Sequence, residues 1–198
     1  MIKIGITGGI GSGKTTVCRV FEILGIPVFY SDTVAREIMT SDPVLVQEMT
    51  AAFGTESYLP AGSLNTKYIA GIVFNDTSAL NRLNSIVHPA VFRAFDAWLL
   101  NVPSHTPYVL KEAALLYESG SYKSCDRTVL VTAPQEIKLG RVMLRDQFSR
   151  EQVQARMDKQ MNDEAKIKLA DEILVNDGTH PVIPQVIGLH RQFLQIKA

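Results

Sequence analysis

The residues of this sequence that are best suited to chemistry lie near its beginning, in Gly8-Gly9-Ile10-Gly11-Ser12-Gly13-Lys14-Thr15. The spacing fits Gly-x-x-x-x-Gly-Lys-[Ser/Thr], in which glycines allow backbone N–H groups to surround a polyphosphate. Lys14 would reach the β- and γ-phosphate oxygens, and the Thr15 hydroxyl would bind Mg²⁺. A helix that starts at this point adds the positive end of its dipole. The pattern predicts a phosphate-binding loop (P-loop) that binds a nucleotide through Gly9, Ile10, Gly11, Ser12, Gly13, Lys14, Thr15 and Thr16.

Two carboxylates follow short apolar runs that are typical of buried strands. Asp32 comes just after Pro27–Tyr30, and Glu112 comes just after Tyr108–Leu110. Ligands of parallel α/β sheets gather at the carboxyl ends of the strands, so Asp32 is expected on the same edge as the P-loop. Asp32 is a candidate for catalysis, for capping the next helix, or for both, since Asp favours helix N-termini. Glu112 is a candidate Mg²⁺ ligand, with an ordinary salt bridge as its alternative.

Further candidates lie in the second half of the chain. Arg141 and Arg145 are four residues apart, so they share one face of the helix predicted from Pro134 through Arg145. A phosphoryl-transfer enzyme needs cations that close over the γ-phosphate, and this pair is therefore the candidate for a lid. Asn176 opens a turn that follows a predicted strand, where it either frames a purine base or serves the turn alone.

Hydrophobic periodicity indicates the elements that must position these groups. Strands are predicted at Ile2–Thr7, Pro27–Tyr30, Tyr108–Leu110, Arg127–Val131 and Ile173–Val175. Helices are predicted at Thr16–Leu24, from the capping box at Ser149 to about Met161, and at Val182–Ile196. The order of these elements predicts an α/β fold, a P-loop NTPase three-layer sandwich with a five-stranded parallel sheet.

Between the second and third strands only helices are predicted, at Pro43–Phe53, Asn65–Phe74, Thr77–Val87 and Pro89–Leu100. His88-Pro89 predicts a break between the last two, because a proline disfavours helical backbone in the residue before it. By itself, His88 is typical of a structural residue at a helix boundary. We expect a single domain over residues 1–198, with its core at 1–32, 103–135 and 169–198, a helical insertion at about 33–102, to which the family resemblance described below assigns substrate binding, and a helical lid at about 136–168.

Composition limits the functional class. The chain has 198 residues, of which 46% are hydrophobic, enough for one compact domain. Its 20 basic and 20 acidic residues cancel, which argues against a general nucleic-acid binder. The two cysteines lack a metal-binding spacing, and neither a signal peptide nor a membrane-spanning run is indicated. We expect a cytoplasmic protein without a nucleic-acid or membrane partner, and the sequence leaves its oligomeric state open.

Further segments, taken together with the P-loop, resemble one family. They are Gly-Ile-Pro-Val at 25–28, Asp32 with Ala35-Arg36-Glu37, His88-Pro89, Leu115-Leu116-Tyr117-Glu118-Ser119-Gly120, and Gln160 with Glu164, Lys166 and Ala170-Asp171. In this order, across almost the whole chain, they resemble the dephospho-coenzyme A kinases. The chain departs from the family in having Tyr30-Ser31-Asp32 for Asp-Ala-Asp, and Glu112-Ala113-Ala114-Leu115-Leu116 for Asp-x-Pro-Leu-Leu.

The resemblance implies that the ribose 3′-hydroxyl of dephospho-coenzyme A is phosphorylated by ATP, with Mg²⁺ as cofactor. Carried over by position, Asp32 orients or deprotonates the acceptor hydroxyl. Lys14 and the loop amides hold the phosphates, Thr15 binds Mg²⁺, and Arg141 neutralises charge on the transferred group. The residues that the resemblance assigns to the acceptor site are Asp32, His88, Leu115, Leu116, Tyr117 and Glu118.

Two alternatives share the P-loop. One is another kinase that acts on a nucleotide or a small molecule. The other is a nucleotide-switch binding protein, which hydrolyses its nucleotide slowly to control a partner. Switches that use GTP usually carry Asn-Lys-x-Asp, and this sequence has no such tetrapeptide.

Overall fold

The computed structural model describes residues 1–74 and 76–196. These residues form two compact units, Met1–Tyr30 with the chain from Val102 onward, and Ser31–Asn101. Lys197 and Ala198, which end the predicted core segment 169–198, and Asn75, which falls in the predicted insertion, lie outside the described residues.

The first unit is built on a five-stranded sheet in the order β2-β3-β1-β4-β5, and all of its neighbouring strands are parallel. The strands are β1 (Ile2–Thr7), β2 (Val28–Tyr30), β3 (Tyr108–Glu112), β4 (Arg127–Thr132) and β5 (Glu172–Val175). The register pairs Ile6 with Glu112 and Thr7 with Leu130, so the carboxyl ends of the strands share one edge. The strand order reverses at β1, which is where ligands bind in open α/β sheets. The predicted α/β fold with five parallel strands is confirmed.

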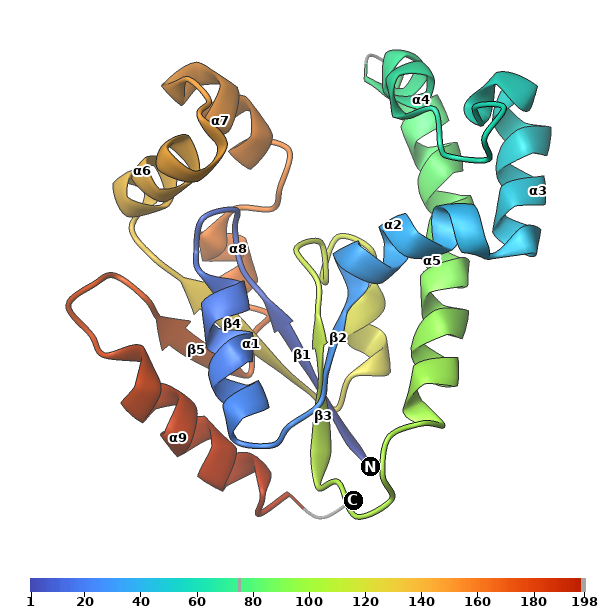
Figure 1. Ribbon diagram of the computed structural model, residues 1–198. Helices are drawn as coiled ribbons and strands as arrows, with labels where there is room; N and C mark the ends of the chain where they lie inside the picture. The colour runs from blue at the N-terminus through green and yellow to red at the C-terminus, as the bar shows by residue number, and fades with distance from the viewer. Residues whose placement is uncertain (75, 197–198) are drawn as a thin grey trace. The chain divides into compact units, whose positions relative to one another are not determined.

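Helices α1 (Lys14–Ile23) and α9 (Val182–Phe193) cover one face of this sheet (Figure 1). Ile4 and Ile6 of β1 are fully buried beneath them, and the rings of Phe21 and Phe193 lie 6.5 Å apart between the two helices. Each such side chain contributes about 1.5–3 kcal/mol by leaving water. This packing fixes the start of α1, and with it the end of the P-loop.

The opposite face is covered by the segment that follows β3 and by α8 (Asp163–Ile167) (Figure 1). A Cβ atom on Gly5 would lie 2.8 Å from Leu116 Cδ2, so the missing side chain lets this segment approach β1. The fully buried Lys166 of α8 lies 3.1 Å from the Glu118 carboxylate and donates a hydrogen bond to the Ala114 carbonyl. The short η2 helix (Ser121–Ser124) completes this layer.

Helices α6 (Gln135–Asp146) and α7 (Arg150–Met157) form a separate small core from Leu139, Val142 and Val153. The capping box predicted at Ser149 is confirmed. The predicted extension of that helix to about Met161 is wrong, because α7 ends at Met157 and α8 starts after Asn162, whose side chain caps it. Gln160 lies between the two helices.

The second unit consists of helices α2 (Ser31–Ser41), α3 (Pro43–Phe53), α4 (Thr66–Val73) and α5 (Thr77–Leu99), with the short η1 (Thr55–Ser57). The break predicted at His88-Pro89 is wrong, because α5 runs through both residues. An internal proline costs a helix about 3 kcal/mol. Burial of Val87, Ala90, Val91 and Phe95 on either side of it offsets that cost.

No helix within residues 1–74 and 76–196 is both long enough and apolar enough to span a bilayer.

Candidate active site

The P-loop joins β1 to α1 at the centre of the carboxyl edge of the sheet. Gly11 and Gly13 have φ values of 81° and 90°, in the left-handed region that side chains disfavour. Neighbours also need the space, since a Cβ on Gly11 would lie 2.4 Å from the Lys138 carbonyl oxygen. The glycine spacing therefore provides both the curvature of the loop and room for α6 beside it.

Lys14 and Glu112 lie together beneath the loop. The Lys14 ammonium donates a hydrogen bond of 2.8 Å to the Gly8 carbonyl and lies 4.0 Å from Glu112 Oε1. Both side chains are largely buried, with exposed fractions of 11% and 9%. A cation from the loop and a carboxylate from β3 thus lie side by side. The cation can offset the negative charge of a phosphate, and the carboxylate can bind the metal ion that accompanies it.

Thr15 and Thr16 lie in the first turn of α1, and both are exposed. Within residues 1–74 and 76–196 no group of three or more His, Cys, Asp or Glu side chains is placed to hold a metal ion. Mg²⁺ in phosphoryl-transfer sites takes only one or two protein oxygens, with phosphates and water as its other ligands. The Thr15 hydroxyl and the Glu112 carboxylate are oxygen donors of the required kind.

Arg141 and Asn176 are brought to the P-loop from distant parts of the chain. Asn176 Nδ2 donates to the Ser12 carbonyl at 2.8 Å, and its Oδ1 accepts from Arg141 Nη2 at 3.3 Å. Arg141 also donates to the Gly11 carbonyl at 3.4 Å. Asn176 therefore braces the loop and holds Arg141 against it. The only sequence signal for this contact is the position of Asn176 after β5.

Arg145, the second arginine of the predicted lid pair, is differently placed. Its guanidinium donates to both carboxylate oxygens of the adjacent Asp146, at 2.7 and 2.9 Å. These hydrogen bonds lower the pKa of Asp146 below its usual range, so the pair stays ionised. Arg141 is thus the arginine of this pair that contacts the P-loop.

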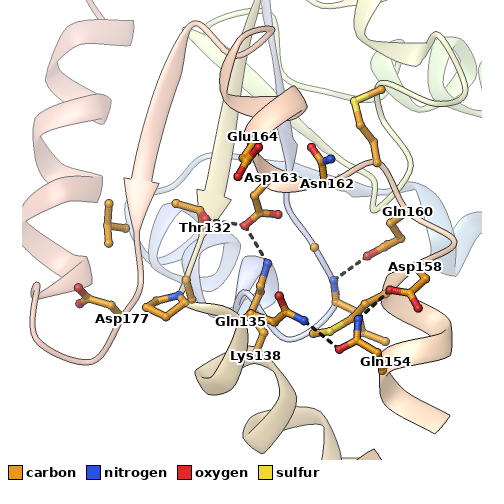
Figure 2. A pocket seen from close by; sticks show the side chains of 17 residues that line it. Thr132, Gln135, Lys138, Gln154, Asp158, Gln160, Asn162, Asp163, Glu164 and Asp177 are labelled. Carbon is orange, nitrogen blue, oxygen red and sulfur yellow. Dashed lines mark hydrogen bonds and ion pairs between the residues drawn. The ribbon is translucent and has the colours of Figure 1, made fainter. Parts of the chain in front are cut away.

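A cavity of about 720 Å³ opens on the outer side of the loop, lined by Gly9 and Ile10 and by residues of β4, α6, α7, the α7–α8 segment and the turn after β5 (Figure 2). Asp163 Oδ2 accepts hydrogen bonds from the Lys138 ammonium at 2.8 Å and from the Thr132 hydroxyl at 2.6 Å. Gln160 Oε1 accepts a hydrogen bond from the backbone N–H of Ile10 at 2.9 Å. Lys138, Asp163 and Thr132 had no predicted role in the site, since none of them belongs to a sequence motif.

The four residues at 115–118 form a turn in which the side chains diverge. Leu116 and Tyr117 are buried, and the Tyr117 hydroxyl donates to Thr128 Oγ1 at 3.0 Å. Leu115 is exposed, and the Glu118 carboxylate also accepts from the Met161 N–H at 2.9 Å. Leu115 is therefore the exposed side chain of this segment, whereas the Glu118 carboxylate is held by Met161 and Lys166.

Asp32 and His88 belong to the second unit. Asp32 is exposed in the first turn of α2, and in the described part of the chain it makes no capping hydrogen bond to that helix. His88 is half-buried on α5, and burial lowers its pKa, which favours the neutral imidazole. The catalytic role of Asp32 and the acceptor role of His88 stay predictions.

Comparison with known proteins adds an independent observation. A family model described as dephospho-CoA kinase matches residues 2–181. The chain belongs to the dephospho-CoA kinase family. The dephospho-CoA kinase of Bacteroides fragilis is 38% identical over 191 residues, which cover 95% of this chain and 91% of that relative. That of Salinibacter ruber is 41% identical over 180 residues and covers 90% of each chain.

The crystal structure of TT1252 from Thermus thermophilus has a TM-score of 0.83 and 34% identity, and the match covers 100% of this chain and 98% of that one. The resemblance to dephospho-CoA kinases is thus confirmed, and so is the prediction of an enzyme. The chain is a kinase, a transferase of the family that serves coenzyme A biosynthesis.

Proposed function

We propose that this kinase transfers the γ-phosphoryl group of ATP to the ribose 3′-hydroxyl of dephospho-CoA, giving CoA and ADP. The observation that carries the proposal is the gathering of Lys14, Arg141 and Asn176 on one P-loop, in a chain that matches the dephospho-CoA kinase family over residues 2–181. Membership of the family indicates dephospho-CoA as the acceptor, and the P-loop provides the groups that can bind a triphosphate.

Asp32 is proposed as the general base. Its carboxylate would take the proton of the 3′-hydroxyl while that oxygen attacks the γ-phosphorus in line. The bond from phosphorus to the β–γ bridging oxygen breaks, and its electron pair leaves on ADP. Proton removal by a positioned carboxylate contributes about 10²- to 10⁴-fold to such a rate. The exposed position of Asp32, two residues after β2, supports this role.

Lys14 and Arg141 are proposed to stabilise the charge that spreads over the γ-phosphoryl oxygens. Phosphoryl transfer depends mainly on positioning and on such electrostatic stabilisation. Lys14 is anchored by the Gly8 carbonyl, and Arg141 by Gly11 and Asn176, so both cations are already placed on the loop before the nucleotide arrives. Fixed charges cost little reorganisation at the moment of reaction.

Mg²⁺ is proposed as the cofactor, held by the Thr15 hydroxyl with help from Glu112. When bound, it would offset the negative charge of the phosphates. The buried Glu112 carboxylate would also keep the Lys14 ammonium in place, since the two groups are 4.0 Å apart.

The remaining assignments follow the family resemblance and form part of the same proposal. His88 and the segment Leu115–Glu118 would bind the acceptor, residues of about 33–102 would form the substrate-binding insertion, and about 136–168 would form the lid. Cys18 and Cys125 are free thiols, which supports a reducing compartment, and we place the reaction in the cytoplasm.

An acceptor comparison tests the proposal. The purified protein would be given Mg·ATP with dephospho-CoA, with nucleoside monophosphates or with a small polyol, and kcat/KM would be measured for each. Dephospho-CoA should be far the best acceptor. A higher kcat/KM for a nucleoside monophosphate would support the alternative of another small-molecule kinase and overturn this proposal.

A further inference from the structure

The part of the P-loop at Gly9 and Ile10 is contacted by side chains from outside the loop. Gln160 lies between α7 and α8, and its Oε1 accepts a hydrogen bond from the backbone N–H of Ile10 at 2.9 Å (Figure 2). The two residues are 150 positions apart in the sequence. The contact is therefore a tertiary one that links the α7–α8 segment directly to the loop.

The chain on the C-terminal side of Gln160 is itself firmly anchored. Met161 N–H donates to the Glu118 carboxylate at 2.9 Å, and the Asn162 side chain caps α8 by accepting from Ala165 N–H at 2.8 Å. Gln160 thus reaches the loop from a fixed backbone. A glutamine held in this way can position its partner, because little freedom is left to its own main chain.

A second contact reaches the loop one residue earlier. Asp163 and Lys138 form an ion pair at 2.8 Å, and their side chains have exposed fractions of 20% and 11%. A Cβ atom on Gly9 would lie 3.4 Å from both the Lys138 ammonium and an oxygen of Asp163, so the pair packs directly against Gly9. Thr132 at the end of β4 fixes the Asp163 carboxylate from the sheet side (Figure 2).

We propose that Gln160 is a positioning residue of the P-loop, which holds Ile10 through its amide oxygen while the Lys138–Asp163 pair supports Gly9. The inference rests on the proposed function for the nature of the nucleotide. A P-loop binds phosphate through N–H groups that converge on one point, so the loop must have the right curvature before binding. A loop held in that shape binds more tightly, because less of the binding free energy is spent on ordering it.

The test compares Gln160→Met with Gln154→Met. Methionine keeps the length of the side chain and removes the acceptor oxygen. Gln154 is a matched control, since it lines the same cavity from α7 and bonds to Gln135 and Asp158 instead of the loop. The Kd for Mg·ATP would be measured by calorimetry, and the amide exchange rate of Ile10 by NMR without nucleotide.

In Gln160→Met, both the Kd for Mg·ATP and the Ile10 exchange rate should rise about tenfold, the effect of one net hydrogen bond. The affinity for the acceptor should stay within about twofold of wild type, which a general loss of folded protein would not produce. Gln154→Met should change neither quantity by more than about twofold. Gln160→Thr, whose hydroxyl is too short to reach Ile10, replaces the methionine variant if that protein does not fold.

An unchanged Kd in Gln160→Met, or an equal change in Gln154→Met, would overturn the proposal. So would an Ile10 exchange rate that does not respond to the substitution. The Kd for Mg·ATP and the Ile10 exchange rate are both measured without a phosphoryl acceptor. A wild-type protein that binds Mg·ATP and does not phosphorylate dephospho-CoA would contradict the proposed function, and the Kd comparison would still decide the role of Gln160.

Discussion

The side-chain nitrogen of Asn176 lies 2.1 Å from the point that a Cβ atom on Gly13 would occupy. That distance is far below contact, so Asn176 fills the space left by the glycine and reaches the Ser12 carbonyl behind it. Gly13, the second fixed glycine of the P-loop motif, is therefore required for two reasons. Its φ of 90° disfavours a side chain, and a Cβ atom there would collide with Asn176, which braces the loop.

Gly13→Ala should accordingly weaken both the fold and nucleotide binding. We expect a loss of about 1–3 kcal/mol in the free energy of unfolding, the usual cost of a strained backbone conformation. The Kd for Mg·ATP should rise because Asn176 is displaced. Urea unfolding and calorimetry measure the two effects.

Gly140→Ala is the matched control for that substitution. Gly140 lies within α6 and is exposed, and a Cβ atom added to it would point into open space. Alanine there should stabilise the protein by about 0.5–1 kcal/mol, because glycine is the poorer helix former. Equal stability changes in the two variants would contradict the double requirement for glycine at position 13.

Asp32→Asn should separate chemistry from nucleotide binding. The amide cannot accept the hydroxyl proton, so kcat should fall by roughly 10²- to 10⁴-fold. The Kd for Mg·ATP should stay near the wild-type value, because the P-loop is unchanged. Steady-state kinetics and calorimetry on one preparation give both numbers, and a wild-type kcat would remove Asp32 from catalysis.

Arg141→Ala should lower kcat about 10³-fold, as the loss of a transition-state arginine does. Arg150→Ala is its control, since Arg150 pairs with Glu136 on the exposed side of α6 and α7 at 2.9 Å. A solvent-exposed pair of this kind adds little to stability, so this variant should retain nearly full activity. Equal losses of kcat in the two variants would contradict a direct role of the Arg141 charge in catalysis.

Asp171 should make part of the stability depend on pH. Burial raises its pKa, and hydrogen bonds from Thr128 N–H and Oγ1, with the Arg127 guanidinium, outweigh burial and hold the pKa below its usual range. A carboxyl with a lowered folded pKa adds stability that is present above its unfolded value of about 4 and is lost as pH falls through the folded value.

Asp171→Asn should therefore lower the free energy of unfolding at pH 7 relative to wild type. The difference between the two proteins should shrink below about pH 4. Urea titrations on both sides of that pH measure it. A difference that is constant over the whole range would contradict the assigned hydrogen bonds to the carboxylate.

Local patterns predicted much of the fold. The P-loop was predicted from four fixed residue types between a strand and a helix. The bounds of β1 and α3 are those that were predicted. The course of α5 could not be predicted in the same way, because local preference at Pro89 is overridden by burial of Val87 and Val91, which depends on tertiary packing.

Residues near the P-loop were predicted where they belong to a sequence motif or, for Arg141, from helical spacing. Lys14 and Thr15 have such a motif. Asn176, Gln160 and the Lys138–Asp163 pair act through contacts with loop residues that are distant in sequence, and periodicity carries no information about such contacts. Asn176 was expected to frame a base or to serve a turn, and its hydrogen bond to Ser12 became visible only in three dimensions.

The decisive measurement for the proposed reaction is the release of ADP from Mg·ATP with and without dephospho-CoA, with the acceptor product identified by mass. We expect ADP release to depend strictly on dephospho-CoA and the product to be CoA, one phosphate heavier than the acceptor. ATP turnover at the same rate without the acceptor, or an acceptor that gains no phosphate, would show that the enzyme does not catalyse this transfer.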